Sequence, residues 1–187
     1  MQISQIPISK NSLIVCALPV THYSDCFCAQ FNSELTLSLE DGIRYLFYNR
    51  PRWLRTLMEF RNILVKPLGL KTEAEANKKH IIPMINIYKG GRIAFFDVLE
   101  CDEKEVLLYI SDNHLDACLS IQLSNTFNLY EIHISTTVML HNIGGRIYFF
   151  FIKPFHILIM RSMLHRLVKH FIHNKKPDNY ENASHFV

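Results

Sequence analysis

The sequence predicts an α+β domain in which a curved antiparallel sheet wraps around a long C-terminal helix. Apolar and polar residues alternate over several stretches between residues 92 and 141, which is typical of half-exposed antiparallel strands. From Pro154 to about residue 173, apolar residues instead recur at helical spacing. Because a sheet with one apolar face must cover it, this amphipathic helix is the available cover.

Two mid-chain helices are expected to cap the open end of the sheet. Ser38 and Asp41 have the spacing of a capping box at the start of the first helix, which runs to Asn49. Pro51 suits the first turn of a second helix over residues 51–66, which Pro67 ends. Residues 1–10 are expected to be a loose lead-in, residues 13–18 a first strand, and residues 21–37 remain ambiguous.

The later elements follow from the alternation. Strands are expected over residues 92–99, 106–111, 114–123, 131–141 and 146–152, with a hairpin turn at residues 142–145. Pro154 then opens the last helix, and its apolar stripe consists of Ile157, Met160, Leu164, Leu167, Val168 and Phe171. Residues 11–173 would form one domain, and residues 174–187 a polar, frayed tail.

Composition excludes several classes of protein. Of the 187 residues, 49% are hydrophobic and 20% are charged, which argues against a disordered chain and a membrane protein. The apolar run at residues 147–160 is shorter than the roughly 20 residues of a membrane span, so no span is expected. A net charge of +3 without a basic stripe predicts no nucleic-acid partner. Five scattered cysteines and no signal-peptide pattern indicate the cytoplasm.

A set of short motifs adds a family resemblance. The motifs are YSDCF (23–27), RPRWL (50–54), PLGLKT (67–72), SDNHLD (111–116), TV (137–138), HN (141–142), GRIY (145–148) and PFH (154–156). Together they resemble the bacterial family called domain of unknown function 2867, over about residues 21–169. That family is similar in fold to the START-like, helix-grip (SRPBCC) proteins, which enclose an apolar cavity between sheet and helix. The resemblance implies the fold and leaves the function open, since helix-grip proteins include carriers, receptors and cyclases.

One polar cluster is expected from strand pairing. If residues 114–123 and 131–141 form a hairpin, one rim of the sheet gathers His114, Asp116, His141, Asn142 and Arg146, with His156 close by. Such a group could orient a carboxylate or phosphate, or carry out acid–base chemistry near neutral pH. The alternative is that these side chains bind loop carbonyls and pin the turns.

Aromatic residues provide the other candidate site. A cavity for an apolar ligand could be lined by Tyr45, Trp53, Phe95, Tyr148 and Phe150, although these side chains could equally fill the core. No metal site and no cofactor are expected, because the chain has no HxH, HExxH, GxSxG or GxGxxG motif.

Three functions remain open at this point. The favoured hypothesis is a binding domain for a small apolar or amphiphilic molecule, held in a pocket between sheet and helix. The first alternative is an enzyme of cyclase, isomerase or hydrolase type that uses the His/Asp/Arg rim of the same pocket. The second is a structural or interaction protein, which could form a homodimer through an exposed strand or helix.

Overall fold

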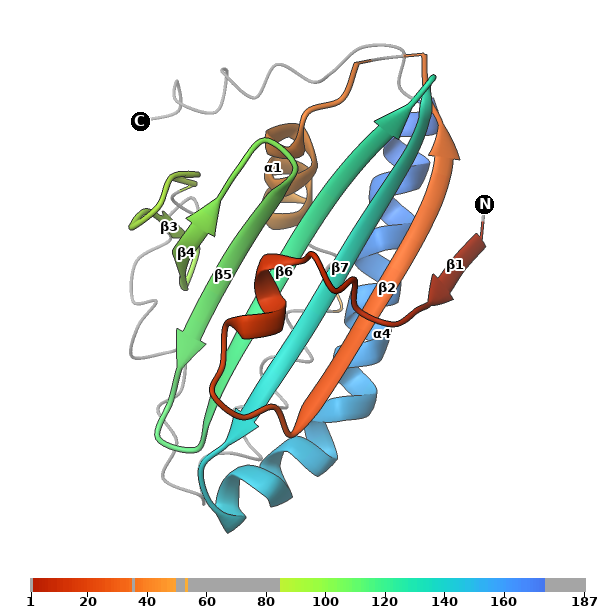
Figure 1. Ribbon diagram of the computed structural model, residues 1–187. Coiled ribbons are helices and arrows are strands. Elements are labelled where there is room, and N and C mark those ends of the chain that lie inside the picture. The colour runs from red at the N-terminus through yellow and green to blue at the C-terminus, as the bar shows by residue number, and fades with distance from the viewer. Residues whose placement is uncertain (1, 35, 50–52, 54–84, 174–187) are drawn as a thin grey trace, which may run out of the picture.

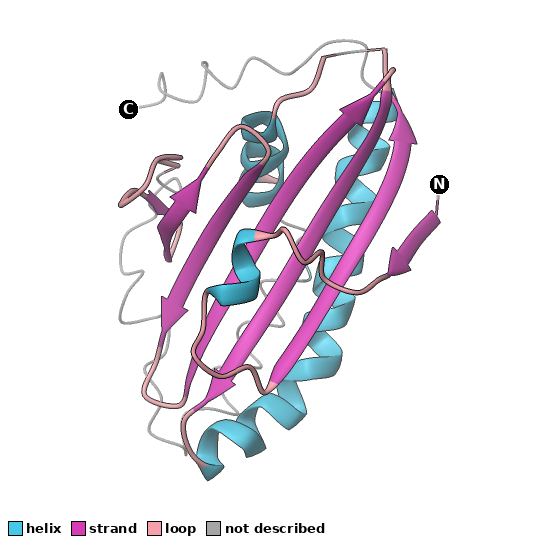
Figure 2. Ribbon diagram, viewed as in Figure 1, coloured by secondary structure: helices cyan, strands magenta, loops and turns pink. Residues whose placement is uncertain are grey.

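The computed structural model describes residues 2–34, 36–49, 53 and 85–173. Seven strands form one sheet in the order β1-β2-β7-β6-β5-β4-β3, and all neighbours are antiparallel. The helices α1 and α4 cover one face of the sheet, here called the inner face, while the short helix η1 lies on the other, outer face (Figures 1 and 2). The predicted α+β helix-grip arrangement is confirmed.

Most of the strands occur where the alternation predicted them. β5 (Glu105–Ser111), β6 (Leu115–Thr126) and β7 (Leu129–Leu140) are confirmed, and β6 and β7 form the predicted hairpin. A turn whose residue Ala94 has a φ of 55° divides the expected strand at 92–99 into β3 (Arg92–Ile93) and β4 (Phe96–Cys101).

The ambiguous N-terminal region contains a long strand of the sheet. β2 (Tyr23–Asn32) pairs with β7 along its whole length, and β1 (Gln2–Gln5) pairs with β2 on its other side. The expected lead-in therefore contains an edge strand. Phe27 of β2 faces the inner core, whereas its neighbours Cys26 and Cys28 face the outer side, as alternation requires.

The predicted strand at residues 13–18 is wrong, because residues Leu13–Cys16 form the 3₁₀ helix η1. The side chain of Ser12 accepts a hydrogen bond from the Ile14 amide, and the Glu105 carboxylate accepts one from the Leu13 amide. These two side chains accept hydrogen bonds from backbone amides. In a strand, the same amides would have required a neighbouring strand as their partner. Ile14 and Leu18 pack with Leu107 and Cys118 on the outer face.

The first mid-chain helix is confirmed. α1 (Leu39–Tyr48) begins with the expected capping box, in which Ser38 and Asp41 each bind the other's backbone amide. The second helix, predicted for residues 51–66, lies outside the described residues except at Trp53. The predicted tail at residues 174–187 lies outside them as well.

The strand and hairpin turn predicted at residues 142–152 are wrong, because one helix, α4, runs over Ile143–His173. The Asn142 side chain accepts a hydrogen bond from the Gly145 amide and so caps the first turn. Gly145 is required for close packing, since a Cβ there would lie 2.2 Å from the His114 carbonyl oxygen. Pro154 lies inside the helix rather than at its start, and α4 bends in this part of its length (Figure 1).

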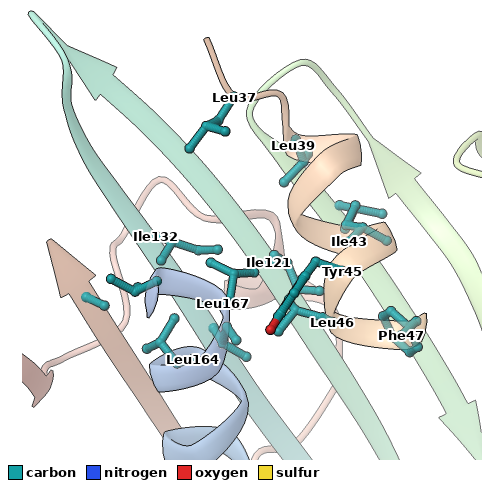
Figure 3. Close-up of a cluster of buried hydrophobic side chains, with 14 of the residues drawn as sticks. Leu37, Leu39, Ile43, Tyr45, Leu46, Phe47, Ile121, Ile132, Leu164 and Leu167 are labelled. Atoms are coloured by element: carbon teal, nitrogen blue, oxygen red, sulfur yellow. The ribbon is translucent and has the colours of Figure 1, made fainter. Parts of the chain in front are cut away.

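The C-terminal half of α4 carries the predicted apolar stripe into the inner core. Leu164 and Leu167 point toward Ile132 of β7 and toward α1, where Tyr45 and Leu46 complete the cluster (Figure 3). The antiparallel sheet, α1 and α4 thus share one continuous core.

The N-terminal half of α4 has a different surface. Its exposed apolar side chains are Ile143, Ile147, Phe150, Phe151 and Leu158. By length and composition, residues 143–172 could span a membrane, and 11% of the most apolar stretch is buried. The helix is thus longer than the run of residues 147–160 from which no span was expected, while its C-terminal half is part of the core.

Candidate functional site

A polar cluster interrupts the apolar inner face between β2 and α4. Tyr23 and Asp25 precede Phe27 by four and two positions on β2, so all three face α4. The Tyr23 hydroxyl donates a hydrogen bond of 2.6 Å to Oδ2 of Asp25. Nε2 of His156, two residues after Pro154 in α4, lies 3.0 Å from the same oxygen. Tyr23 and His156, which lies 131 positions after Asp25, therefore meet at one carboxylate.

The carboxylate of Asp25 is unusually buried for a charged group. Its side chain is 0% exposed, and its second oxygen, Oδ1, has no hydrogen-bond partner among the described residues. Thr136 is the direct cross-strand partner of Asp25, and its buried Oγ1 also lacks a partner there. A buried polar atom without a partner costs about 1–3 kcal/mol, so two on neighbouring residues call for an explanation.

Electrostatics fix Tyr23 in one protonation state. Burial, followed by the hydrogen bond to Asp25 and the charge of Asp25, raises the pKa of the Tyr23 hydroxyl well above its usual range. The phenol therefore remains a hydrogen-bond donor throughout the physiological pH range. The ring of Tyr23 is held by Phe149, at 4.9 Å between centroids, and by the Lys153 ammonium, 4.8 Å from the ring centroid.

The rim predicted from strand pairing forms two separate pairs. Nε2 of His141 lies 3.1 Å from Oδ2 of Asp116, and Nδ1 of His114 lies 3.0 Å from Oδ1 of Asn142. Asp116 lies on the same side of β6 as Cys118, which packs under η1, so the Asp116–His141 pair belongs to the outer face. This pair therefore lies on the opposite side of the sheet from α4 and the Asp25 cluster.

Arg146 and the predicted aromatic residues are dispersed. Arg146 lies exposed in the first turn of α4, because the hairpin expected to bring it beside His141 is a helix. On the same helix, Phe150 is exposed and Tyr148 is partly buried. Trp53 and Phe95, which lie in other parts of the chain, are also exposed. Tyr45 is buried between α1 and α4, where it stacks on His170 at 4.3 Å between ring centroids (Figure 3).

Sequence reasoning did not identify the Asp25 cluster as a site. The motifs YSDCF and PFH contain all three of its residues, but their pairing depends on the unassigned strand β2 and on a helix that extends past Pro154. A second group was not predicted because Cys28 is distant in sequence from Glu131 and His133. Cys28, Glu131 and His133 offer ligand atoms within 4.8 Å of one another on the outer face.

The comparisons with known proteins concern family and fold. Residues 17–163 match the family described as "Protein of unknown function (DUF2867)". No curated protein matches the chain. Among solved structures, CalU16 from Micromonospora echinospora aligns with 12% sequence identity and a TM-score of 0.34, over 81% of this chain and 89% of that protein.

Proposed function

Because the chain belongs to the DUF2867 family of proteins of unknown function, we propose its function from the site itself: it is a binding domain for a small amphiphilic molecule. The ligand's apolar part would lie between the sheet and α4, and its polar end would reach Asp25. The observation that carries this proposal is the buried Oδ1 of Asp25 beside the buried Oγ1 of Thr136, both without a protein partner in the described structure.

The chemistry of these two atoms selects the polar end of the ligand. An ionised carboxylate accepts hydrogen bonds, whereas a threonine hydroxyl can donate one. A ligand hydroxyl between them would donate to Asp25 and accept from Thr136, which satisfies both atoms at once. An anionic head group would be repelled by Asp25, so an alcohol suits the site better than a fatty acid.

The side chains around Asp25 and Thr136 suit the apolar part of the ligand. Within the same two strands, the neighbours of Asp25 and Thr136 on the inner face are Phe27, Ile134 and Val138, all buried. From α4, Phe149 and His156 approach Tyr23. A pocket lined mainly by apolar groups with few polar atoms is typical of small-molecule sites. The free cysteines suit a reducing compartment, so we propose the cytoplasm as the location of the protein.

Calorimetry on the full chain tests the proposal by comparing the binding of decanol with the binding of decanoate. We expect decanol to bind and Asp25→Asn to weaken its affinity about tenfold or more, because a hydrogen bond to a charged group contributes roughly 1.5–3 kcal/mol. Thr136→Val, which retains the shape of the side chain, should weaken it several-fold.

Asp116→Asn is the matched control, because Asp116 is also buried and paired with a histidine, but on the outer face. It should leave decanol affinity unchanged. Absence of decanol binding, or equal affinity for folded Asp25→Asn and wild type, would refute the proposal. Circular dichroism establishes that each variant is folded, and Thr136→Val decides the matter if Asp25→Asn is not.

The contact between Asp25 and His156 favours one alternative, an acid–base enzyme that uses the same cluster of side chains. A carboxylate can orient an imidazole and stabilise its charged form, which is how histidine serves as a general base. His156→Gln separates the two functions. In a binding domain the variant changes only ligand affinity, whereas in an enzyme it abolishes conversion of a ligand that it still binds.

A further inference from the structure

Three side chains of metal-ligand type converge on the outer face, on the opposite side of the sheet from the Asp25 cluster. Cys28 of β2 is the direct cross-strand partner of His133 of β7, and Glu131 lies two positions before His133. Alternation places all three on one face. Their Sγ, carboxylate and imidazole ligand atoms lie within 4.8 Å of one another.

We propose that Cys28, Glu131 and His133 bind a zinc-type divalent cation, with a fourth position open to water. Thiolate, imidazole and carboxylate are the three ligand types that Zn²⁺ takes in proteins, and three protein ligands with one open position are typical of its non-structural sites. A sulfur ligand disfavours Mg²⁺ and Ca²⁺, which require oxygen.

The surroundings of the three ligands fit this role. Cys28 is 5% exposed, while Glu131 and His133 are partly buried, so the cation would lie at the surface of the sheet with access from solvent. Nε2 of Gln30 donates to Oε2 of Glu131 at 2.6 Å, which orients the carboxylate and leaves Oε1 directed toward His133. Outer-shell hydrogen bonds of this kind commonly hold metal ligands in place.

The two acidic ligands differ in charge state before a cation binds. The hydrogen bond from Gln30 and the nearby His133 lower the pKa of Glu131, although burial opposes them, so this ligand is ionised at neutral pH. Burial, together with the charge of Glu131, raises the pKa of the Cys28 thiol to about 12. This raised pKa opposes binding, because a cation must displace the proton that the thiol holds at neutral pH, so the proposal depends on the convergence of the three ligand atoms.

A cation also requires a small opening of the present geometry. Nε2 of His133 lies 2.5 Å from Oε1 of Glu131, whereas two ligands of tetrahedral zinc stand about 3.3 Å apart. Both side chains are partly exposed, at 19% and 33%, so rotation of either one provides the separation without moving the strands.

Titration of the metal-free full chain with Co²⁺, followed by absorption spectroscopy, tests the site. We expect one equivalent to produce a thiolate-to-cobalt charge-transfer band, which Zn²⁺ then abolishes by displacement. Cys28→Ser should remove the band, and Glu131→Gln and His133→Gln should each weaken Co²⁺ affinity about tenfold or more, within the range seen for loss of a ligating or orienting group.

Cys16→Ser is the matched control, because Cys16 is an exposed thiol that would account for adventitious binding. It should leave the band and the affinity unchanged. Absence of the band in the wild type, or its loss in Cys16→Ser and survival in Cys28→Ser, would overturn the proposal. Asp25→Asn should not affect Co²⁺ binding, so this test is independent of the ligand site on the inner face.

Discussion

Substitution of Glu105 by alanine should destabilise the protein strongly, although the residue belongs to neither proposed site. Glu105 begins β5, is 4% exposed and points to the outer face. Its carboxylate accepts four hydrogen bonds, from Ser12 Oγ at 2.6 Å, Leu13 N at 3.0 Å, Ser120 Oγ at 2.5 Å and Gln122 Nε2 at 2.6 Å. The side chain thus ties η1 to strands β5 and β6.

The magnitude follows from the donors that alanine would leave behind. A buried donor without an acceptor costs about 1–3 kcal/mol. The Ser12 and Ser120 hydroxyls can rotate toward other acceptors, whereas the Leu13 amide and the Gln122 side chain are held by η1 and β6. We therefore expect Glu105→Ala to reduce the free energy of unfolding by about 3–5 kcal/mol, a large share of the 5–15 kcal/mol typical of a domain.

Urea denaturation measures this change, and amide hydrogen exchange at residues 13–16 shows whether η1 opens first. Glu103→Ala is the control, because Glu103 is exposed in the turn just before β5 and should change stability by at most about 0.5 kcal/mol. A loss below about 1 kcal/mol for Glu105→Ala, or unchanged exchange in η1, would refute the role assigned to the buried carboxylate.

The remaining predictions concern two glycine and two cysteine residues. Gly42→Ala should raise stability by about 0.5–1 kcal/mol in thermal melts, because its Cβ would meet only side-chain carbons at 3.9 Å within α1. Gly145→Ala should lower stability by about 1–3 kcal/mol, since its Cβ would lie 2.2 Å from a backbone oxygen. At neutral pH, iodoacetamide should modify exposed Cys16 rapidly and buried Cys118 only upon unfolding, as mass spectrometry of timed samples would reveal. Burial raises the pKa of Cys118 to about 11, above its unfolded value of about 8.5, so this thiol should favour the folded state below pH 8.5 and lose that contribution as the pH rises to 11.

The elements that the sequence predicted correctly are those with local signals. The capping box of Ser38 and Asp41 lies within a single helical turn, so α1 could be located from adjacent residues. β6 and β7 were predicted from their alternation, and the hairpin that they form was also predicted correctly. In the structure, Phe127 and Asn128, both at positive φ, form the two-residue turn between these strands.

The elements whose predictions were wrong depend in part on contacts with residues that are distant in the sequence. η1 is capped by Glu105, 93 residues from Ser12. The aromatic run in residues 146–152 favours a strand by intrinsic propensity, yet it forms the start of α4, because Asn142 caps the helix and Gly145 lets it pack against His114. The Asn142 cap is visible in a local window of sequence, whereas the contacts with Glu105 and His114 are not.

The same limit applies to the candidate site. Alternation and strand pairing correctly predicted that His141 lies close to Asp116, but they could not show on which face of the sheet the pair lies. That choice depends on which side of the sheet α4 covers. The Asp25–His156 contact required both the pairing of β2 and the continuation of α4 through Pro154, and each of these departs from the local pattern.

Both proposed sites lie on the paired strands β2 and β7, one on each face of the sheet. Tyr23, Asp25 and Thr136 face α4, whereas Cys28, Glu131 and His133 face away from it. A shift of one strand by a single residue would turn each of its side chains to the opposite face. Such a slip would place Asp25 in the outer layer and remove Phe27 from the inner core, which lies between the strands and α4. The buried apolar residues of β2 therefore set the register on which both sites depend, so a stable core and two chemically distinct surfaces follow from the same alternation.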